Sequence, residues 1–413
     1  MPQVFSGWML YLLIIVMVIS IIRIYYYLRT IQSGAPMDRP VIKVAPVPVL
    51  EQDLDAEPEE DSLLDGPDDL IRQGDYEGAL KSLDQLLEDL SPTEDREARG
   101  KVLFRVGACH SRLATGEERF QHLLRAGEAL REAVRLFSPA RFRNLYLRAL
   151  GELASLQEDL AEGKNPVENL TQSARTCETA AASAREDGMV VPEVMFLIRS
   201  GTVYNRLASH HEPQVNLRKA ADAYEKALAA LETVDGESAI EEKMKVLKML
   251  GDTLVKLAGY FQKEECLIRA SKAYDGALEL MDEGEHSQER CVVLTNSGGV
   301  LLELYDLEKS PAYLRRALRY SRDALDAAKG EVKLVAKGFA MAVMGDALTR
   351  YAEVKDRSEN LERAVKLYET ALGIIKDGEE PAQRERIREN LAETVQKITG
   401  VGEGANRGGG EKA

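Results

Sequence analysis

Apolar and polar positions divide the chain into four stretches with different patterns. Residues 8–28 are almost uninterruptedly apolar, whereas residues 31–66 show no regular pattern. Between residues 67 and 399 the apolar positions recur with the period of amphipathic helices, about 3.6 residues. Residues 400–413 are rich in glycine and carry no such period. The pattern therefore predicts an apolar helix, a linker, a long helical region and a disordered tail.

The helical region repeats every 44–50 residues. In each of six units a glycine lies inside an apolar-periodic segment, and in five of them the motif Leu-x-x-Ala-x-x-x-Tyr-x-x-Ala begins 16 residues later. The motif has Leu130 in place of tyrosine in the first unit, is displaced by three residues to Leu170 in the second, and has its tyrosine shifted to Tyr320 in the fifth. The glycines are Gly107, Gly151, Gly201, Gly251, Gly298 and Gly345, and the motif is clearest at Leu217/Ala220/Tyr224/Ala227, Leu267/Ala270/Tyr274/Ala277 and Leu361/Ala364/Tyr368/Ala371.

This repeat predicts an all-α fold, an α-solenoid of helix-turn-helix units over residues 67–399. In each antiparallel pair, Gly and Ala would let the two backbones approach closely, and the Tyr or Leu would fill the space beyond them. An isolated pair cannot cover its apolar faces, so successive units would stack on one another and share a core. We expect residues 71–80 to belong to an N-terminal half unit and residues 381–398 to form a C-terminal capping helix.

The repeat resembles the tetratricopeptide repeat (TPR) family. The segment Gly201-Thr-Val-Tyr204, followed by Ala220 and Tyr224, is similar to that family's pattern. The usual TPR unit has about 34 residues, whereas the units here are longer and lack the Trp and Pro of the family pattern, so the resemblance is to a long-helix variant. It covers residues 68–398 and implies a non-catalytic module that binds other proteins.

The resemblance also implies which side chains would line a binding groove, because the first helix of each TPR pair lines the concave face. One hypothesis is that basic side chains at these positions bind an acidic or carboxylate-bearing peptide through charge-assisted hydrogen bonds. The other is a solvated face of mixed charge, since Glu152, Asp252, Glu303 and Asp346 alternate with the bases. The candidate groove residues are Lys101, Arg112, Arg148, Asn205, Arg206, Lys245, Lys248, Lys256 and Arg350, with Phe104, Met195 and Phe339 as apolar spots.

The apolar stretch predicts a single-pass membrane anchor at residues 8–28. About 20 helical residues span a bilayer, and Trp8 and Tyr25–Tyr27 stand at the two ends, where interfacial aromatic residues are expected. A cleaved signal peptide would need basic residues at its start, and residues 2–7 contain none. The basic residues Arg23, Arg29, Arg39 and Lys43 all follow the apolar run, which predicts that the solenoid lies on the cytoplasmic side.

Charge is distributed unevenly. The whole chain carries −15, and residues 31–66 alone hold nine acidic and two basic residues, a net −7. With its prolines, this segment reads as an extended acidic linker that would hold the solenoid roughly 30 Å from the bilayer. The acidic balance argues against binding to nucleic acid, which needs a basic surface.

We find no motif for catalysis, a cofactor or a metal. Gly400-x-Gly402-x-Gly404 lacks the strand context of a dinucleotide site, and His210-His211-Glu212 has no further ligands nearby. Cys109 and His110 are adjacent on a helix and so point in different directions, and Cys177, at the tyrosine position of the motif, is predicted to be buried. We therefore expect no enzyme, no cofactor and no small-molecule substrate.

Two functions are consistent with these features of the sequence. The first is a membrane-anchored scaffold or adaptor that recruits a protein partner, possibly an acidic one, through the solenoid surface. The alternative is an accessory or regulatory subunit of a membrane enzyme or transport complex, in which the anchor helix itself packs on partner helices. The span contains no small-x-x-x-small pair, the usual feature of such an interface.

Overall fold

The computed structural model describes residues 63–282, 286–329, 332–376 and 378–399. The predicted anchor at residues 8–28, the tail at 400–413 and nearly all of the linker at 31–66 lie outside these residues. Within the described ranges every element is an α-helix, apart from one short 3-10 turn, η2 (Gly116–Glu118). None of these helices is both long enough and apolar enough to cross a membrane.

The described chain is a run of antiparallel helix pairs, so the predicted all-α solenoid is confirmed. Each glycine of the repeat lies in the first helix of its pair, and the Leu-Ala-Tyr-Ala motif lies in the second. The elements are α2 (Asp65–Arg72), α3 (Tyr76–Asp89), α4 (Arg96–Leu113), α5 (Arg119–Leu136), α6 (Arg143–Gly163), α7 (Pro166–Glu186), α8 (Val190–Ala208), α9 (Pro213–Leu231), α10 (Glu237–Ala258), α11 (Lys263–Glu279), α12 (Ser287–Glu308), α13 (Pro311–Ala327), α14 (Leu334–Tyr351), α15 (Arg357–Ile374) and α16 (Pro381–Thr399).

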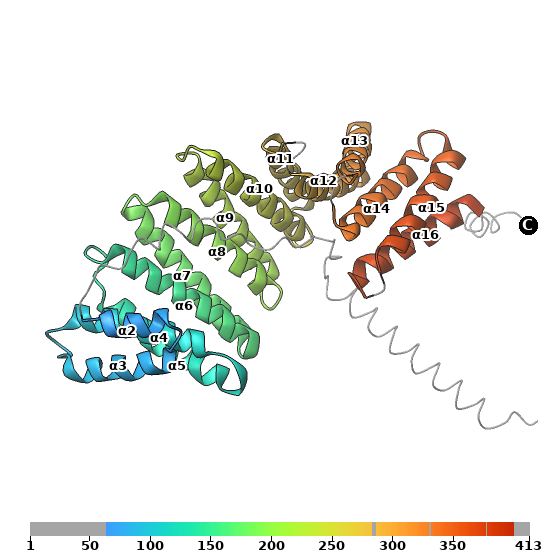
Figure 1. Ribbon diagram of the computed structural model, residues 1–413. Helices are drawn as coiled ribbons and strands as arrows, with labels where there is room; N and C mark the ends of the chain where they lie inside the picture. Colours follow the sequence, from blue (N-terminus) through green and yellow to red (C-terminus); the bar gives the residue numbers. More distant parts are fainter. Residues whose placement is uncertain (1–62, 283–285, 330–331, 377, 400–413) are drawn as a thin grey trace, which may run out of the picture.

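The pairs follow one another around an arch (Figure 1). The second helices α9, α11 and α13 lie on its outer side, and the first helices α8, α10, α12 and α14 lie on its inner side. We call α4, α6, α8, α10, α12, α14 and α16 the inner helices and the surface they form the inner face. Buried side chains make a continuous cluster from α6 to α12, so neighbouring units share a core rather than holding separate ones.

The repeated glycines are required by the aromatic rings of the second helices. A Cβ added to Gly201 would lie 2.6 Å from Tyr224, and one added to Gly345 would lie 2.8 Å from Tyr368. The tyrosine ring therefore lies directly against the glycine, in the space a side chain would occupy, and does not fill a gap beyond it as the sequence suggested. At Gly151, whose unit has its motif displaced, a Cβ would meet only Phe196 at an ordinary 3.7 Å.

The turns inside the pairs share a backbone feature. A non-glycine residue with positive φ immediately precedes four of the second helices: Asn165 (50°), Glu212 (39°), Gln262 (38°) and Asp356 (49°). Four residues later, Asn216 and Asn360 donate side-chain hydrogen bonds to backbone carbonyls, 2.6 and 2.8 Å long, across the turn. These bonds fix the sharp reversal between first and second helix.

Arginines at the start of some inner helices bind the end of the preceding outer helix. Arg99 donates to the carbonyls of Leu87 (2.8 Å) and Leu90 (3.0 Å), and Arg384 donates to those of Ile375 (2.9 Å) and Leu372 (3.1 Å). The last carbonyls of a helix have no partner within it, so a cation there satisfies them and matches the helix dipole. These contacts set the angle between one unit and the next.

Candidate functional site

Most of the candidate groove residues lie on inner helices and are engaged with acidic or aromatic side chains. Arg206 pairs with Glu158 at 2.6 Å, and Arg199 binds the other oxygen of the same carboxylate at 2.8 Å. Lys245 lies 3.6 Å from Glu242 and 3.8 Å from Glu241 on its own helix. The inner face is therefore a surface of paired charges over these residues, and not an uninterrupted basic stripe.

Aromatic rings hold two of the other bases. Lys101 Nζ lies 5.3 Å from the centre of the Phe142 ring, and the Arg148 guanidinium lies 5.5 Å from that of Phe104. Such cation–π contacts contribute about 0.5–1 kcal/mol at partly exposed sites. Arg112 is exposed near the end of α4, and Lys256 is half-buried near the end of α10.

Arg350 is the most strongly held of the candidates. It reaches across from α14 to Asp306 on α12 through three hydrogen bonds of 2.6–3.1 Å. Burial alone would lower the pKa of Arg350, but its hydrogen bonds to Asp306 and the nearby charge of Asp346 raise that pKa above its ordinary value. The same contact holds the pKa of Asp306 low against the opposing effect of burial.

Two buried carboxylates of the inner face, Asp252 and Asp346, each hold the same three-residue contact, which we call the Tyr–Asp–Asn clasp. In the first clasp, Asp252 on α10 accepts hydrogen bonds from the hydroxyl of Tyr274 on α11 (2.6 Å) and from the amide of Asn296 on α12 (3.1 Å). Its other oxygen is 2.8 Å from Lys248. One carboxylate therefore ties three successive helices together.

The second clasp repeats this arrangement two units later. Asp346 on α14 accepts from Tyr368 on α15 and from Asn390 on α16, both at 2.7 Å. Burial and the neighbouring Asp346 charge raise the pKa of Tyr368 well above its ordinary value, so its hydroxyl remains the donor. The cation of this clasp differs, because Ala342 stands at the place of Lys248 and Arg386 of α16 approaches Asp346 instead, at 3.5 Å.

The unit between the two clasps has none. At the Asp, Tyr and Asn positions it carries Gly299, Ser321 and Val343. The Ser321 hydroxyl turns back onto its own helix and donates to Ala317 (2.8 Å), while the neighbouring Tyr320 bonds to Asp275 on α11 (2.9 Å). Without the clasp, α12 and α14 pack on each other more extensively than other successive inner helices do.

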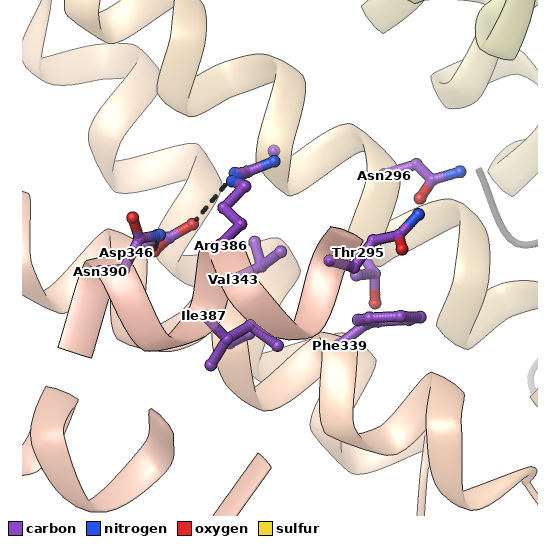
Figure 2. Close-up of a pocket in the computed structure, with 11 residues that line it drawn as sticks. Thr295, Asn296, Phe339, Val343, Asp346, Arg386, Ile387 and Asn390 are labelled. Carbon is purple, nitrogen blue, oxygen red and sulfur yellow. Dashed lines mark hydrogen bonds and ion pairs between the residues drawn. The ribbon is translucent and has the colours of Figure 1, made fainter. Parts of the chain in front are cut away.

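A pocket opens on the inner face at this gap, between α12, α14 and α16. Its empty volume is ≈ 500 Å³, part of which is open to solvent. Figure 2 shows Arg386 on one side of it and Phe339 on the other, with Val343 and Ile387 between them. The residues that line it are Thr295, Asn296, Gly299, Phe339, Ala342, Val343, Asp346, Gln383, Arg386, Ile387 and Asn390. The floor is thus largely apolar and the rim carries polar groups of both clasps.

The other sequence candidates for chemistry lie elsewhere. Cys109, Cys177, Cys266 and Cys291 are all buried free thiols, as predicted for Cys177. Burial raises the pKa of Cys177 to about 12 and those of Cys109 and Cys291 to about 11. His211 lies in the exposed turn after α8, where Glu212 is 3.7 Å away. Over the described ranges, no group of three or more His, Cys, Asp or Glu side chains is arranged to hold a metal ion.

Sequence reasoning missed the pairing of His110 with His122. Their Nδ1 atoms are 2.9 Å apart, joining α4 to α5. Burial lowers the pKa of His110, and the nearby His122 and Arg125 lower it further, against the opposing charge of Asp84. The pair could have been found from the antiparallel register of the two helices, which places residues 110 and 122 side by side.

The clasps were also missed, although their spacing is visible in the sequence. In both of them the Tyr follows the Asp by 22 residues and the Asn follows the Tyr by another 22. The sequence alone is compatible with Asp252 and Asp346 as surface acids of a mixed-charge face, whereas both are buried. Only the burial of the Asp distinguishes a structural carboxylate from a solvated one.

Comparisons with known proteins find similar architectures among solved structures. No protein-family model matches the chain, and no curated protein matches its sequence. The C-terminal part of a TPR repeat-containing protein from Cytophaga hutchinsonii aligns with a TM-score of 0.47 and 11% identity, covering 79% of this chain and 98% of the other. The TPR2AB domain of yeast Sti1, in a structure titled as a complex with pHSP90, aligns with a TM-score of 0.27 and 15% identity, covering 72% and 99%. The P58(IPK) TPR domain aligns with a TM-score of 0.25 and 12% identity, covering 85% and 99%.

Proposed function

We propose that this protein is a non-catalytic scaffold that residues 8–28 anchor to a membrane and whose solenoid recruits a protein partner, with the array on the cytoplasmic side. The observation that carries the proposal is the inner face: successive inner helices present half-exposed charged side chains along one surface, interrupted by one largely apolar pocket. Such a surface suits an extended polypeptide, because it offers side-chain contacts to several residues in a row. The acidic linker sets the reach of the array from the bilayer.

The candidate groove residues enter this proposal unequally. Lys248 holds Asp252, and Arg350 holds Asp306, so both serve the fold. Arg112 is exposed and Lys245 and Lys256 are half-buried, so these three can meet an acidic partner without releasing Asp252 or Asp306. An acidic segment would compete with Glu241 and Glu242 for Lys245, which favours binding that weakens as salt rises.

Charge reversal on the inner face tests the groove. Full-length chain in mild detergent is used to isolate co-purifying proteins, and the capture is repeated with Lys245→Glu plus Lys256→Glu. The matched control is Lys226→Glu plus Lys272→Glu, which places the same charge change at exposed positions on the outer helices α9 and α11. We expect loss of capture with the first pair only; equal capture by both variants, each with an unchanged melting temperature, refutes the groove.

Deletion of residues 1–30 tests the anchor and the alternative function. A scaffold lacking these residues should leave the membrane fraction and still capture its partner. If the partner is lost together with the membrane association, the intramembrane accessory-subunit function is correct instead. If the full chain is released from membranes by high salt or alkaline carbonate, the anchor proposal fails.

A further inference from the structure

We propose that the pocket between α12, α14 and α16 is a specificity pocket, which takes one large apolar side chain of a partner segment while Arg386 binds a carboxylate next to that side chain. This rests on the proposed function, since it names the chemistry that the inner face selects.

Smaller side chains at two repeat positions explain why the cavity exists. At the corresponding site two units earlier, α8 carries Thr202 and α10 carries Lys248, whose side chain reaches Asp252. At the pocket, Gly299 on α12 and Ala342 on α14 stand at these two positions. The cavity therefore lies where the site two units earlier carries two larger side chains. Its walls Phe339 and Ile387 are themselves buried, so they are held in position before any partner arrives.

Arg386 supplies the charge at the rim of the pocket. Asp346 already receives two hydrogen bonds of 2.7 Å from Tyr368 and Asn390, and the Arg350 guanidinium is close enough for the two charges to interact. Both hydrogen bonds reach Oδ1, and Arg386 makes a longer 3.5 Å contact to the other oxygen, Oδ2, with 29% of its side chain exposed. Because a guanidinium carries five N–H donors, Arg386 can keep this contact and bind a second carboxylate. A guanidinium beside an apolar cavity is complementary to a carboxylate beside an apolar side chain.

The fit excludes ligands of other kinds. A basic segment would bring its charge against Arg386 and gains no exposed carboxylate, because Asp346 is buried and already contacted by Tyr368, Asn390 and Arg386. A small side chain such as alanine would leave the cavity empty, and lose the dispersion contacts with Phe339, Val343 and Ile387. The predicted recognition element is therefore Leu, Met or Phe followed or preceded by Asp or Glu.

The test uses the full chain in lipid nanodiscs and methyl NMR of Ala342, Val343 and Ile387. The probe is the capped tetrapeptide acetyl-Gly-Leu-Glu-Gly-amide, with a Leu→Ala and a Glu→Gln analogue. We expect saturable shifts of these methyls with the parent peptide and about fiftyfold weaker binding of the Leu→Ala analogue, since that analogue loses the burial of about three methyl or methylene groups. On the wild-type protein the Glu→Gln analogue should bind more weakly than the parent peptide. On Arg386→Gln the two peptides should bind equally.

Ala342→Lys is the decisive variant, because it restores the residue that the first clasp carries and fills the cavity. It should abolish the shifts at Val343 and Ile387 with no loss of helicity, while Lys226→Gln on α9 leaves them unchanged. If the parent peptide gives no saturable shift, or if both analogues bind as well as it does, the inference is wrong. Concentration-dependent shifts without peptide would assign the pocket to a second copy of the chain and also overturn it.

These outcomes are separable from the scaffold proposal. If partner capture survives while the peptide fails at the pocket, the scaffold stands and the pocket inference falls. If the peptide binds as expected and no partner is captured, the pocket inference stands and the scaffold proposal falls.

Discussion

The ring of Tyr274 lies against Gly251, so that a Cβ on the glycine would be 2.6 Å from the Cε1 of the tyrosine. Both residues are buried, and the hydrogen bond from the tyrosine hydroxyl to Asp252 holds the ring in place. Neither the ring nor the helix backbone can therefore move aside without a loss of stability. The same pair recurs in two other units. This contact, and the clasp attached to it, determine how the array responds to substitution.

Gly251→Ala should therefore destabilise the array. Overpacking a buried site costs about 1–3 kcal/mol, and the helix-propensity gain of alanine over glycine, about 1 kcal/mol, offsets part of it. Gly298→Ala is the control, because its Cβ would meet Ser321 and Val343 at a milder 3.3 Å. Urea unfolding followed by circular dichroism should show a lower midpoint for Gly251→Ala and little change for Gly298→Ala. Equal midpoints would contradict the role assigned to the ring.

Tyr274→Phe tests the first clasp. It removes the hydroxyl donor from a buried carboxylate, and we expect the free energy of unfolding to fall by about 1–3 kcal/mol. Tyr224→Phe is matched in position and burial, but its hydroxyl meets the neutral Thr202 at 3.2 Å, so its loss should be smaller. Hydrogen exchange should localise the effect of Tyr274→Phe to α10–α12. A larger loss for Tyr224→Phe would show that the carboxylate is not the important partner.

The cysteines should be unreactive in the folded protein. Burial raises the pKa of Cys177 to about 12 and that of Cys291 to about 11, so at pH 8 both are thiols and not the nucleophilic thiolate. Titration with a chromogenic disulfide should detect no rapid reaction in buffer, and all four thiols in denaturant. Rapid labelling of one cysteine in buffer would reveal local opening of its unit.

The histidine pair predicts acid sensitivity near the N-terminal end of the described array. Because the pKa of His110 is lower in the folded protein than in the unfolded chain, the unfolded state binds more protons at mildly acidic pH. The stability that neutral His110 contributes to the folded state is fully present above the unfolded pKa of about 6.5. It is lost as the pH falls below that value. His122, Arg125, Asp84 and Glu118 are the charged or titratable groups around the pair.

The measurement is the melting temperature as a function of pH for wild type and His110→Gln. Both should fall at low pH, where carboxylates titrate, but wild type should fall more between pH 7 and pH 5. Parallel curves over that interval would show that the pair does not contribute.

The periodic sequence determined the architecture. The spacing of Gly201, Gly251 and Gly345, each followed at the same distance by a tyrosine motif, sufficed to predict stacked helix pairs. Helical periodicity is a local property of the sequence, and each repeat packs its two helices in the same way. The burial of Cys177 followed from its place in the motif for the same reason.

Tertiary structure decided what the polar residues of the inner face do. Lys248 and Asp252 look like surface charges in the sequence, yet Asp252 is buried and Lys248, with 12% of its side chain exposed, pairs with it. Burial depends on the approach of α12, which no local pattern encodes. The pocket is likewise invisible in any single segment: Gly299, Ala342 and Arg386 lie on three helices, and only the stacking of those helices brings them together around one cavity.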